Sequence, residues 1–231
     1  MKSFLILIIG LLTLSSCSIV QIMFTEQSSN NLKIEKNKYV YENDTIKLIY
    51  DFWAEDGVMG FEIENKLDIP IYIDWKKSSF ISSKNKFDYY LDRETTNSKS
   101  ISAYRPFLFH TTIGNSEGTS VSIKEERITF IPPHAVSAQA KYKICSKEYI
   151  IMRGIKKSYL GDTKIKEKIR NFTSENAIIS FRNFITYSTK ENFEYEKYIS
   201  NGFYVKYVIE TKARKTDLFI SPQKFYLRVP R

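Results

Sequence analysis

Cys17 is the side chain whose position in this sequence points most directly to a chemical role. It follows one basic residue, Lys2, and an uncharged apolar run from Phe4 to Leu14. That run has about 11 residues, within the 7–15 that form the core of an export signal and short of the roughly 20 needed to cross a bilayer. Residues 1–16 are therefore predicted to be an export signal, with the Cys17 thiol at the cleavage point.

The four residues Leu14-Ser15-Ser16-Cys17 resemble the lipobox of bacterial lipoproteins, in which an apolar residue and two small residues precede a cysteine. The resemblance implies cleavage between Ser16 and Cys17 and lipidation of the Cys17 sulfur with fatty acyl chains such as palmitate. The thiolate is the nucleophile that accepts the lipid, and two or more chains give stable membrane anchoring. By analogy with enterobacterial sorting, Ser18 favours the outer membrane over the inner membrane.

Few other side chains have the types and spacing of a metal or catalytic centre. His110, His134 and Cys145 are far apart in the sequence and match no metal-ligand spacing. The chain also has no Gly-x-Ser-x-Gly, phosphate-loop or dinucleotide-binding glycine motif. Cys145 lies in an alternating apolar stretch and is predicted to be a small buried hydrophobic residue. Neither a metal nor a cofactor is predicted.

Acidic residues gather between Asp51 and Glu64, and a pair of carboxylates is the machinery of many glycosidases. Glu62 and Glu64 alternate with Phe61 and Ile63, however, which is the pattern of a strand with one solvated face. The alternation favours a surface role for both. The alternative is an envelope glycan or peptidoglycan hydrolase whose carboxylates are brought together by folding.

Aromatic side chains are abundant, with 16 Tyr, 16 Phe and two Trp. Those at alternating strand positions are expected in the core. The segment from Phe193 to Tyr198 differs because aromatic and charged residues are interleaved in a predicted connection. Phe193, Tyr195 and Tyr198 are therefore candidate binding residues, and exposed rings of this kind suit an envelope protein or a glycan as partner.

One short motif indicates a second covalent modification. Asp44-Thr45-Ile46 resembles the Asp-Ser/Thr-apolar sequon of O-glycosylation in exported Bacteroidota proteins. The resemblance makes Thr45 a candidate O-glycosylation site at the start of a predicted strand.

The chain is basic, with a net charge of +9, and loss of Lys2 with the export signal leaves +8. Such a charge can attract anionic lipid headgroups, acidic glycans or nucleic acid. The Lys and Arg residues are scattered through predicted strands and loops, apart from short clusters at Lys156-Lys157 and Lys164–Arg170. This scatter and the predicted export argue against nucleic acid as a partner.

The chain after the export signal is predicted to have two parts. Residues 17–38 are expected to be the acylated cysteine and a flexible tether, because the polar stretch 27–31 has little to bury. Residues 39–231 are expected to form one β-sandwich domain. Within it, residues 92–118 are polar and rich in Ser, Thr and Asn, which predicts a loop insertion.

From residue 39 onward the dominant hydrophobic period is two, which is typical of strands. Predicted strands cover 45–53, 58–64, 69–75, 79–81, 87–91, 120–123, 127–131, 140–144, 149–152, 177–187, 203–211 and 219–229. Ile165, Ile169 and Phe172 instead recur at helical spacing and predict one short helix over 163–172. Many short strands and one helix predict a mainly all-β fold, an antiparallel β-sandwich.

The segment Phe61–Phe80, a hairpin followed by Pro-Ile-Tyr-Ile-Asp-Trp, resembles small uncharacterised lipoproteins of Bacteroidota. The pieces Ile131–Pro133 and Phe181–Tyr187 fit the same pattern, so the resemblance covers most of residues 39–212. It implies an immunoglobulin-like fold and assigns no activity, because the shared motifs are packing and turn patterns. The sequence therefore predicts a lipid-anchored envelope protein that acts by binding or structural association and is not an enzyme.

Overall fold

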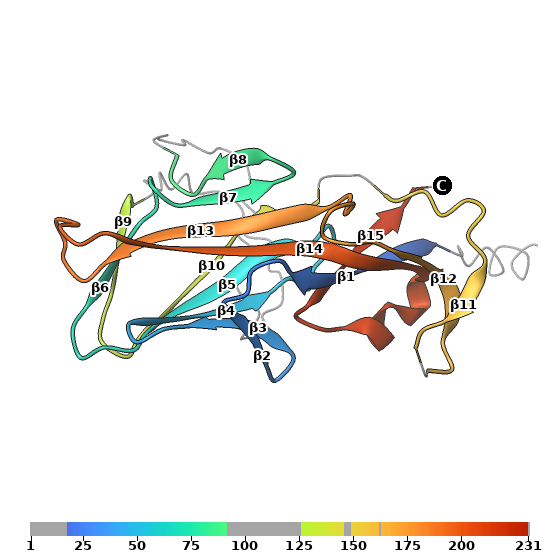
Figure 1. Cartoon of the computed structure of the whole chain (residues 1–231), viewed down its shortest axis with the longest axis horizontal. Coiled ribbons are helices and arrows are strands. Elements are labelled where there is room, and N and C mark those ends of the chain that lie inside the picture. The colour runs from blue at the N-terminus through green and yellow to red at the C-terminus, as the bar shows by residue number, and fades with distance from the viewer. Residues whose placement is uncertain (1–17, 92–125, 146–148, 162, 231) are drawn as a thin grey trace, which may run out of the picture.

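The chain folds as an antiparallel β-sandwich (Figure 1). The computed structural model describes residues 18–91, 126–145, 149–161 and 163–230. These residues form 15 strands and one short 3-10 helix, η1 (Ala213–Phe219). The predicted all-β fold class is confirmed.

The larger sheet contains ten strands. Its path runs β11-β12-β14-β13-β6-β9, with β1 and β15 added beside β14 and with β7 and β8 added beside β13. The bounds are β1 (Ile19–Gln27), β6 (Ile71–Asp74), β7 (Ser79–Ser82), β8 (Asn85–Asp88), β9 (Ile128–Ile131), β11 (Lys157–Tyr159), β12 (Lys166–Asn171), β13 (Ser180–Ser188), β14 (Lys197–Lys212) and β15 (Lys224–Val229).

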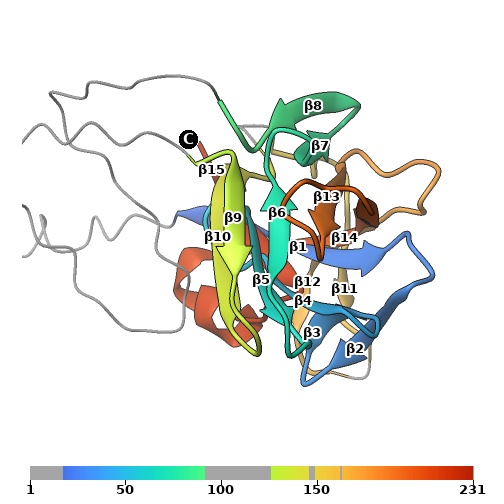
Figure 2. The same ribbon diagram turned by 90° about the vertical axis from the view of Figure 1, so that its left-hand side faces the viewer.

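The smaller sheet contains five strands in the order β10-β5-β4-β3-β2 and packs across the larger sheet (Figure 2). The bounds are β2 (Leu32–Glu35), β3 (Lys38–Glu42), β4 (Ile46–Asp51), β5 (Val58–Asn65) and β10 (Val136–Lys143). The chain passes between the sheets twice at one corner, where the buried Asn65 amide donates hydrogen bonds to the carbonyl oxygens of Ile69, Ile131 and Pro132 at 2.8–3.1 Å. Asn65 thus stabilises both connections between the sheets, from β5 to β6 and from β9 to β10.

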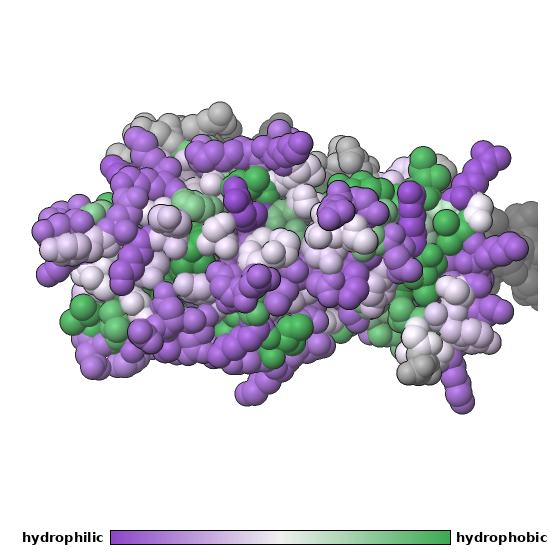
Figure 3. All heavy atoms as spheres, in the orientation of Figure 1, coloured by the Kyte–Doolittle hydropathy of each residue, from purple (hydrophilic) through white to green (hydrophobic). Residues whose placement is uncertain are grey.

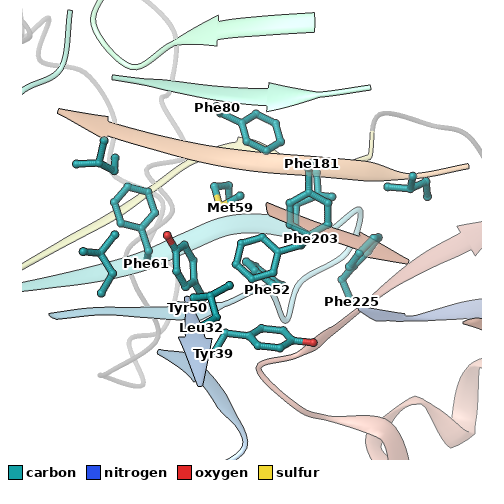
Figure 4. Packing of buried hydrophobic residues seen from close by; sticks show 14 of the residues in the cluster. Leu32, Tyr39, Tyr50, Phe52, Met59, Phe61, Phe80, Phe181, Phe203 and Phe225 are labelled. Atoms are coloured by element: carbon teal, nitrogen blue, oxygen red, sulfur yellow. The ribbon is translucent and has the colours of Figure 1, made fainter. Parts of the chain in front are cut away.

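Aromatic rings from both sheets fill the core (Figure 4). Phe52 of the small-sheet layer meets Phe181 and Phe203 of the large sheet edge-on, with ring centroids 5.2 and 5.0 Å apart. Tyr50 packs beside them and donates its hydroxyl proton to the Asn201 amide oxygen at 2.8 Å. Edge-to-face rings and a paired hydroxyl let large side chains pack without leaving a buried polar atom unpaired.

β1 corrects the predicted tether. Residues 19–27 lie inside the large sheet, where β1 pairs with β14 on one side and with β15 on the other. Val20, Ile22 and Phe24 pack with Phe219 of η1, while Met23 on the opposite face packs into the main core. An apolar run buried on both faces forms a central strand, so the prediction of a flexible segment is wrong for the described part of 17–38.

β14 sets the long axis of the molecule (Figure 1). Its 16 residues extend about 50 Å at roughly 3.3 Å per residue. Its first half pairs with β13, and its second half lies between β12 and β1. We call the end where β13 turns into β14 the distal end, and the end where Ile19, Lys212 and Val229 lie level across β1, β14 and β15 the proximal end.

Three other local predictions need correction. The predicted helix over 163–172 is largely strand β12, because the exposed edge of β14 offers Ile169 a partner in Ile209 and this pairing outweighs local periodicity. Residues 149–152 form no strand; instead, the backbone of Ile150 exchanges hydrogen bonds with the Gln21 amide. The predicted connection before 203 is strand from Lys197 onward. The loop insertion at 92–118 and the predicted strand at 120–123 lie outside the described residues.

Replacing Ile22 by Ala should lower the free energy of unfolding by about 2–5 kcal/mol, because the fully buried side chain would leave a cavity beneath η1. The matched control is Ile34→Ala, in the same segment but 61% exposed, which should change stability by no more than about 0.5 kcal/mol. Urea unfolding followed by circular dichroism measures both. If both substitutions changed stability by the same small amount, residues 19–27 would not be a buried strand and the prediction of a flexible tether would stand.

Candidate functional site

The three candidate binding residues lie together in the hairpin between β13 and β14, at the distal end. Tyr195 and Tyr198 are among the most exposed large side chains of the described chain, at 62% and 71%, whereas Phe193 is half-buried. Phe193 also has a left-handed backbone, with φ of 55°, which is uncommon for a bulky residue. The hairpin therefore holds two rings outward, Tyr195 from its turn and Tyr198 from the start of β14.

Local hydrogen bonds order this turn. The Phe193 N–H donates to the Lys190 carbonyl oxygen at 3.0 Å, and the Glu194 N–H donates to the Asn192 side-chain oxygen at 3.1 Å. An ion pair between Glu196 and Lys77 joins the hairpin to the turn between β6 and β7. These contacts limit the conformations of the exposed rings, which reduces the entropy lost when a partner binds.

The register of four strands extends the aromatic surface beyond the hairpin. Tyr198 of β14 lies opposite Thr186 of β13, Ser188 lies opposite Tyr72 of β6, and Tyr72 lies opposite Phe130 of β9. Because side chains alternate between the faces of a sheet, Tyr198, Tyr72 and Phe130 lie on its outer face.

Phe184 completes this surface. It lies two residues before Thr186 and its ring stacks on Tyr198 with centroids 5.6 Å apart, while the Tyr72 and Phe130 rings meet edge-on at 5.8 Å. We call Phe184, Tyr198, Tyr72 and Phe130 the outer aromatic face; Tyr198 and Phe130 are its most exposed members.

Three of these four residues, Tyr72, Phe130 and Phe184, were not predicted from the sequence as binding residues. Alternate residues of a strand point to opposite faces of the sheet. Tyr72 therefore lies on the face away from its apolar neighbours Ile71 and Ile73, and Phe130 on the face away from Thr129 and Ile131, so each was recognisable as an outward-facing aromatic. What the sequence does not reveal is that β6, β9, β13 and β14 are neighbours.

A buried ionic network positions the turn that separates the two aromatic pairs. The Asp74 carboxylate is fully buried, accepts a hydrogen bond from Arg127 at 2.9 Å and accepts a second from the Lys76 N–H at 3.0 Å. The Ser78 hydroxyl donates to the Asp74 carbonyl oxygen and accepts the Thr186 N–H. The network therefore fixes the turn against β13.

The charge state of Asp74 follows from these partners. Burial acts to raise the pKa of the Asp74 carboxyl, but the hydrogen bond and charge of Arg127 and the backbone N–H groups of Lys76 and Lys77 hold that pKa below its ordinary value. The group is therefore ionised at neutral pH and stabilises the turn in that form.

An open pocket of about 440 Å³ lies elsewhere, between the chain before β2 and the turn after β3. It is lined by Asn30, Asn31, Leu32, Lys33, Glu42, Asn43, Asp44 and Lys66. Its Glu42 carboxylate is held by Lys33 at 2.8 Å and by Lys66 at 2.7 Å, and these hydrogen bonds lower the pKa of Glu42 to about 2. A general acid needs a pKa near the working pH, so Glu42 is unsuited to that role.

A second groove, of about 390 Å³, lies where β1, β3, β14 and β15 meet. The Lys224 ammonium lies 4.4 Å from the centroid of the Phe24 ring, which stacks on Tyr207, and burial lowers the pKa of Lys224. Gln27 Oε1 and Gln223 Nε2 are buried here with no hydrogen-bond partner among the described residues. Glu26 is the single acidic side chain that the described part of the chain contributes to this lining.

The other sequence-predicted residues do not join these sites. Thr45 is buried at the start of β4, so the folded chain does not present its hydroxyl to a glycosyltransferase. Cys145 is buried, as predicted, and His134 is exposed beside Asp68. Ser16, Cys17 and His110 lie outside the described residues. Within the described ranges, no three His, Cys, Asp or Glu side chains cluster as metal ligands.

Comparison with known proteins gives no match: no family model, no curated protein sequence and no solved structure is significantly similar to this chain. No helix in the described part of the chain combines the length and apolarity needed to cross a membrane. The functional interpretation therefore depends on the geometry of the two ends.

Replacing Asp74 by Asn should lower stability at pH 7 by about 1.5–3 kcal/mol, because it removes a charge-assisted hydrogen bond from a buried carboxylate. The pKa of Asp74 is lower in the folded state than in the unfolded state, where it is about 3.9. Ionised Asp74 therefore stabilises the fold at pH values above the unfolded pKa, and this stabilisation is lost as the pH falls through the folded pKa. The difference between wild type and variant should therefore shrink as the pH falls below the unfolded pKa, and it should disappear once the pH has passed the lowered folded pKa.

Unfolding by urea over a pH series tests this expectation. The control is Asp68→Asn, whose side chain is almost fully exposed and pairs with the exposed His134. Exposed pairs contribute little to stability, so this variant should shift the unfolding midpoint at pH 7 much less than Asp74→Asn does. A penalty for Asp74→Asn that does not vary with pH would show that the charge of Asp74 is not what stabilises the turn.

Proposed function

We propose that this chain is a lipid-anchored, non-enzymatic envelope protein, held to the membrane through acylated Cys17, that binds an envelope protein or glycan through its outer aromatic face. The observation that carries the proposal is the placement of the two ends along β14. Ser18, bonded to Cys17 in the chain, lies at the proximal end, whereas the outer aromatic face lies at the distal end. An anchor and a binding surface so arranged leave the surface free for a partner.

The chemistry of the distal end supports binding. Exposed Tyr and Phe side chains bring a large apolar area and a polar edge with few rotatable bonds, which is the composition of binding hot spots. The neighbouring hairpin residues 188–198 add two Lys and three Glu, so polar contacts are available around the rings. Rings of this kind stack on the faces of sugars and pack against apolar protein side chains.

The alternative of a hydrolase gains less support. The open pocket holds two carboxylates, Glu42 and Asp44, but Glu42 is held ionised by two lysines. In the groove beside β15 a single carboxylate, Glu26, is paired with Lys206 at 2.7 Å. Acid–base hydrolysis of a glycan needs two carboxyl groups with different proton affinities across one cleft. The binding function therefore accounts better for the described residues.

The anchor makes a direct prediction. Cells that express the tagged chain and are fed an alkyne-labelled fatty acid should incorporate the label into the wild type and lose it in Cys17→Ala, because the thiol is the acceptor. Cys145→Ala is the matched control and should keep full label, since Cys145 is buried. An unlabelled wild type, or equal label in Cys17→Ala, would contradict the anchor. Location in the outer membrane is checked by fractionating the labelled cells.

The outer aromatic face makes a second prediction. Affinity capture of the anchored protein after crosslinking in intact cells should recover a discrete partner, and the double substitution Tyr198→Ser/Phe130→Ser should reduce its yield at least tenfold, equivalent to about 1.4 kcal/mol. Both rings are largely exposed, so the variant should fold normally.

The control for this experiment is Ile34→Ser/Tyr149→Ser, which removes two exposed side chains away from the distal end. It should retain the partner. Treating the captured complex separately with protease and with glycosidases distinguishes a protein from a glycan. Equal yields from the two double variants would locate binding elsewhere on the chain and refute the role of the outer aromatic face.

A further inference from the structure

The proximal end is a row of strand ends. Five neighbouring strands, in the order β11-β12-β14-β1-β15, finish or begin there. Ile19 lies opposite Lys212 on one side and opposite Val229 on the other. In the next pair of strands, Lys168 of β12 lies opposite Glu210 of β14. Because the strands are antiparallel, Lys166 is level with Lys212, and Tyr159 of β11 lies opposite Lys166. In Figure 1 these strand ends and the C-terminus gather at the right-hand end.

The position of the anchor relative to this row follows from covalent geometry. Cys17 and Ser18 are joined by one peptide bond, which sets their Cα atoms about 3.8 Å apart. The Ser18 carbonyl oxygen accepts a hydrogen bond from the Ala213 N–H at 2.9 Å, so Ser18 is already part of the folded body. With no tether after Ser18, lipid attached to Cys17 would bring the strand ends to the level of the headgroups.

Positive charge is concentrated around this end. Residues 149–170 and 207–217 contain ten Lys and Arg and four Asp and Glu, a net charge of +6, whereas the whole chain from Cys17 onward carries +8. The clusters at Lys156-Lys157 and Lys164–Arg170 thus lie near Lys212 in space, because β11, β12 and the end of β14 are adjacent. By contrast, the distal hairpin 188–198 has a net charge of −1.

Several of these cations have no acidic partner in the described ranges. Lys168 is paired with Glu210, and Lys157 and Lys215 both contact Glu167. Lys164, Lys166 and Lys212 are exposed and form no ion pair with any described carboxylate. The same holds for Arg214, which follows Ala213 in η1. These side chains can therefore reach an external anion without breaking an ion pair with a described carboxylate.

Exposed apolar side chains accompany the charges. Tyr159 is 61% exposed, with the Lys166 ammonium 5.4 Å from the centroid of its ring, and Ile19 and Ile151 are also exposed. Figure 3 shows hydrophobic and hydrophilic side chains interleaved toward this end of the molecule. Tyrosine beside lysine is typical of surfaces at the membrane interface, where a ring enters the headgroup layer and an ammonium meets phosphate.

We propose that the proximal end is a lipid-contact surface that binds anionic phospholipid headgroups through Lys164, Lys166, Lys212 and Arg214, with the exposed Tyr159 ring beside Lys166. The proposal rests on the anchoring at Cys17 for its orientation, and the surface itself makes the contact. This contact would fix the orientation of the domain, with β14 pointing away from the membrane and the outer aromatic face at the end farthest from the membrane.

Distances favour this contact. Neighbouring strands are about 4.8 Å apart, so Lys212 and Lys166 lie within roughly 10 Å of β1, which is one Debye length at 0.1 M salt. Their charges are therefore only partly screened from headgroups at the anchor. A lysine close to an anionic bilayer strengthens binding about fivefold, so three of them together have a large effect.

Residues 18–231, which contain every described strand, are the probe for a binding test without acyl chains. Circular dichroism first establishes that they fold. They should co-sediment with vesicles of mixed phosphatidylglycerol and phosphatidylcholine, bind phosphatidylcholine vesicles at least about tenfold more weakly, and be released by high salt. The substitutions Lys164→Glu, Lys166→Glu and Lys212→Glu together should weaken binding to the anionic vesicles by at least about tenfold.

The matched control reverses three lysines at or near the distal end: Lys76→Glu, Lys190→Glu and Lys197→Glu. All three are exposed, and the change in net charge is the same. This control should bind within about twofold of the wild type, since its charges are more than a Debye length from the surface. A variant with Gln at the three proximal positions checks the result if the Glu variant fails to fold. Equal losses in the proximal and distal variants, or equal binding to neutral and anionic vesicles, would overturn the proposal.

The result separates this surface from the anchor. Binding of residues 18–231 to anionic vesicles with no fatty-acid label on Cys17 in cells would retain the lipid-contact surface and refute the anchor. Label on Cys17 with no binding by residues 18–231 would retain the anchor and refute the surface. The two proposals therefore fail in different experiments.

Discussion

The antiparallel pairing of β1 with β14 is the constraint on which the rest of the structure depends. β1 is buried on both faces, so it joins the main core through Met23 and the smaller cluster beneath η1 through Ile22. β14 in turn connects β13 at one end with β12 and β1 at the other. Because a single strand spans the molecule, the orientation of one end determines that of the other.

Buried polar groups give this framework its specific geometry. Asn65 fastens the corner where the chain crosses between the sheets, and the hydroxyl of Tyr50 reaches Asn201 across the core. Asp74 and Arg127 hold the turn that lies against the distal hairpin. Apolar packing alone would tolerate shifted registers, whereas a buried carboxylate or amide left without its partners costs several kcal/mol (~1–3 for each unpaired group). The distal surface is therefore fixed in shape by groups beneath it.

The proximal and distal ends differ in chemistry in a way that suits an asymmetric environment. One end is basic and leads to Cys17 in the chain. The other end is aromatic, and its hairpin 188–198 has a net charge of −1. The exposed members of the two surfaces, such as Tyr198 and Phe130 at one end and Lys166 and Lys212 at the other, are available for contacts. In the proposed orientation, the outer aromatic face would lie about 50 Å, the length of β14, from the proximal end.

The sequence alone predicted the all-β class, most strands and the burial of Cys145, because a hydrophobic period of two and its flanking turns are local properties. The candidate rings at 193, 195 and 198 were likewise visible as aromatics among charges. Only the tertiary structure decided that 19–27 is a central strand, that 166–171 is a strand and that the lysine cluster at 164–170 lies beside Lys212. Those features depend on which strands become neighbours, and pairing between residues almost 200 positions apart, such as Ile19 and Lys212, leaves no local pattern.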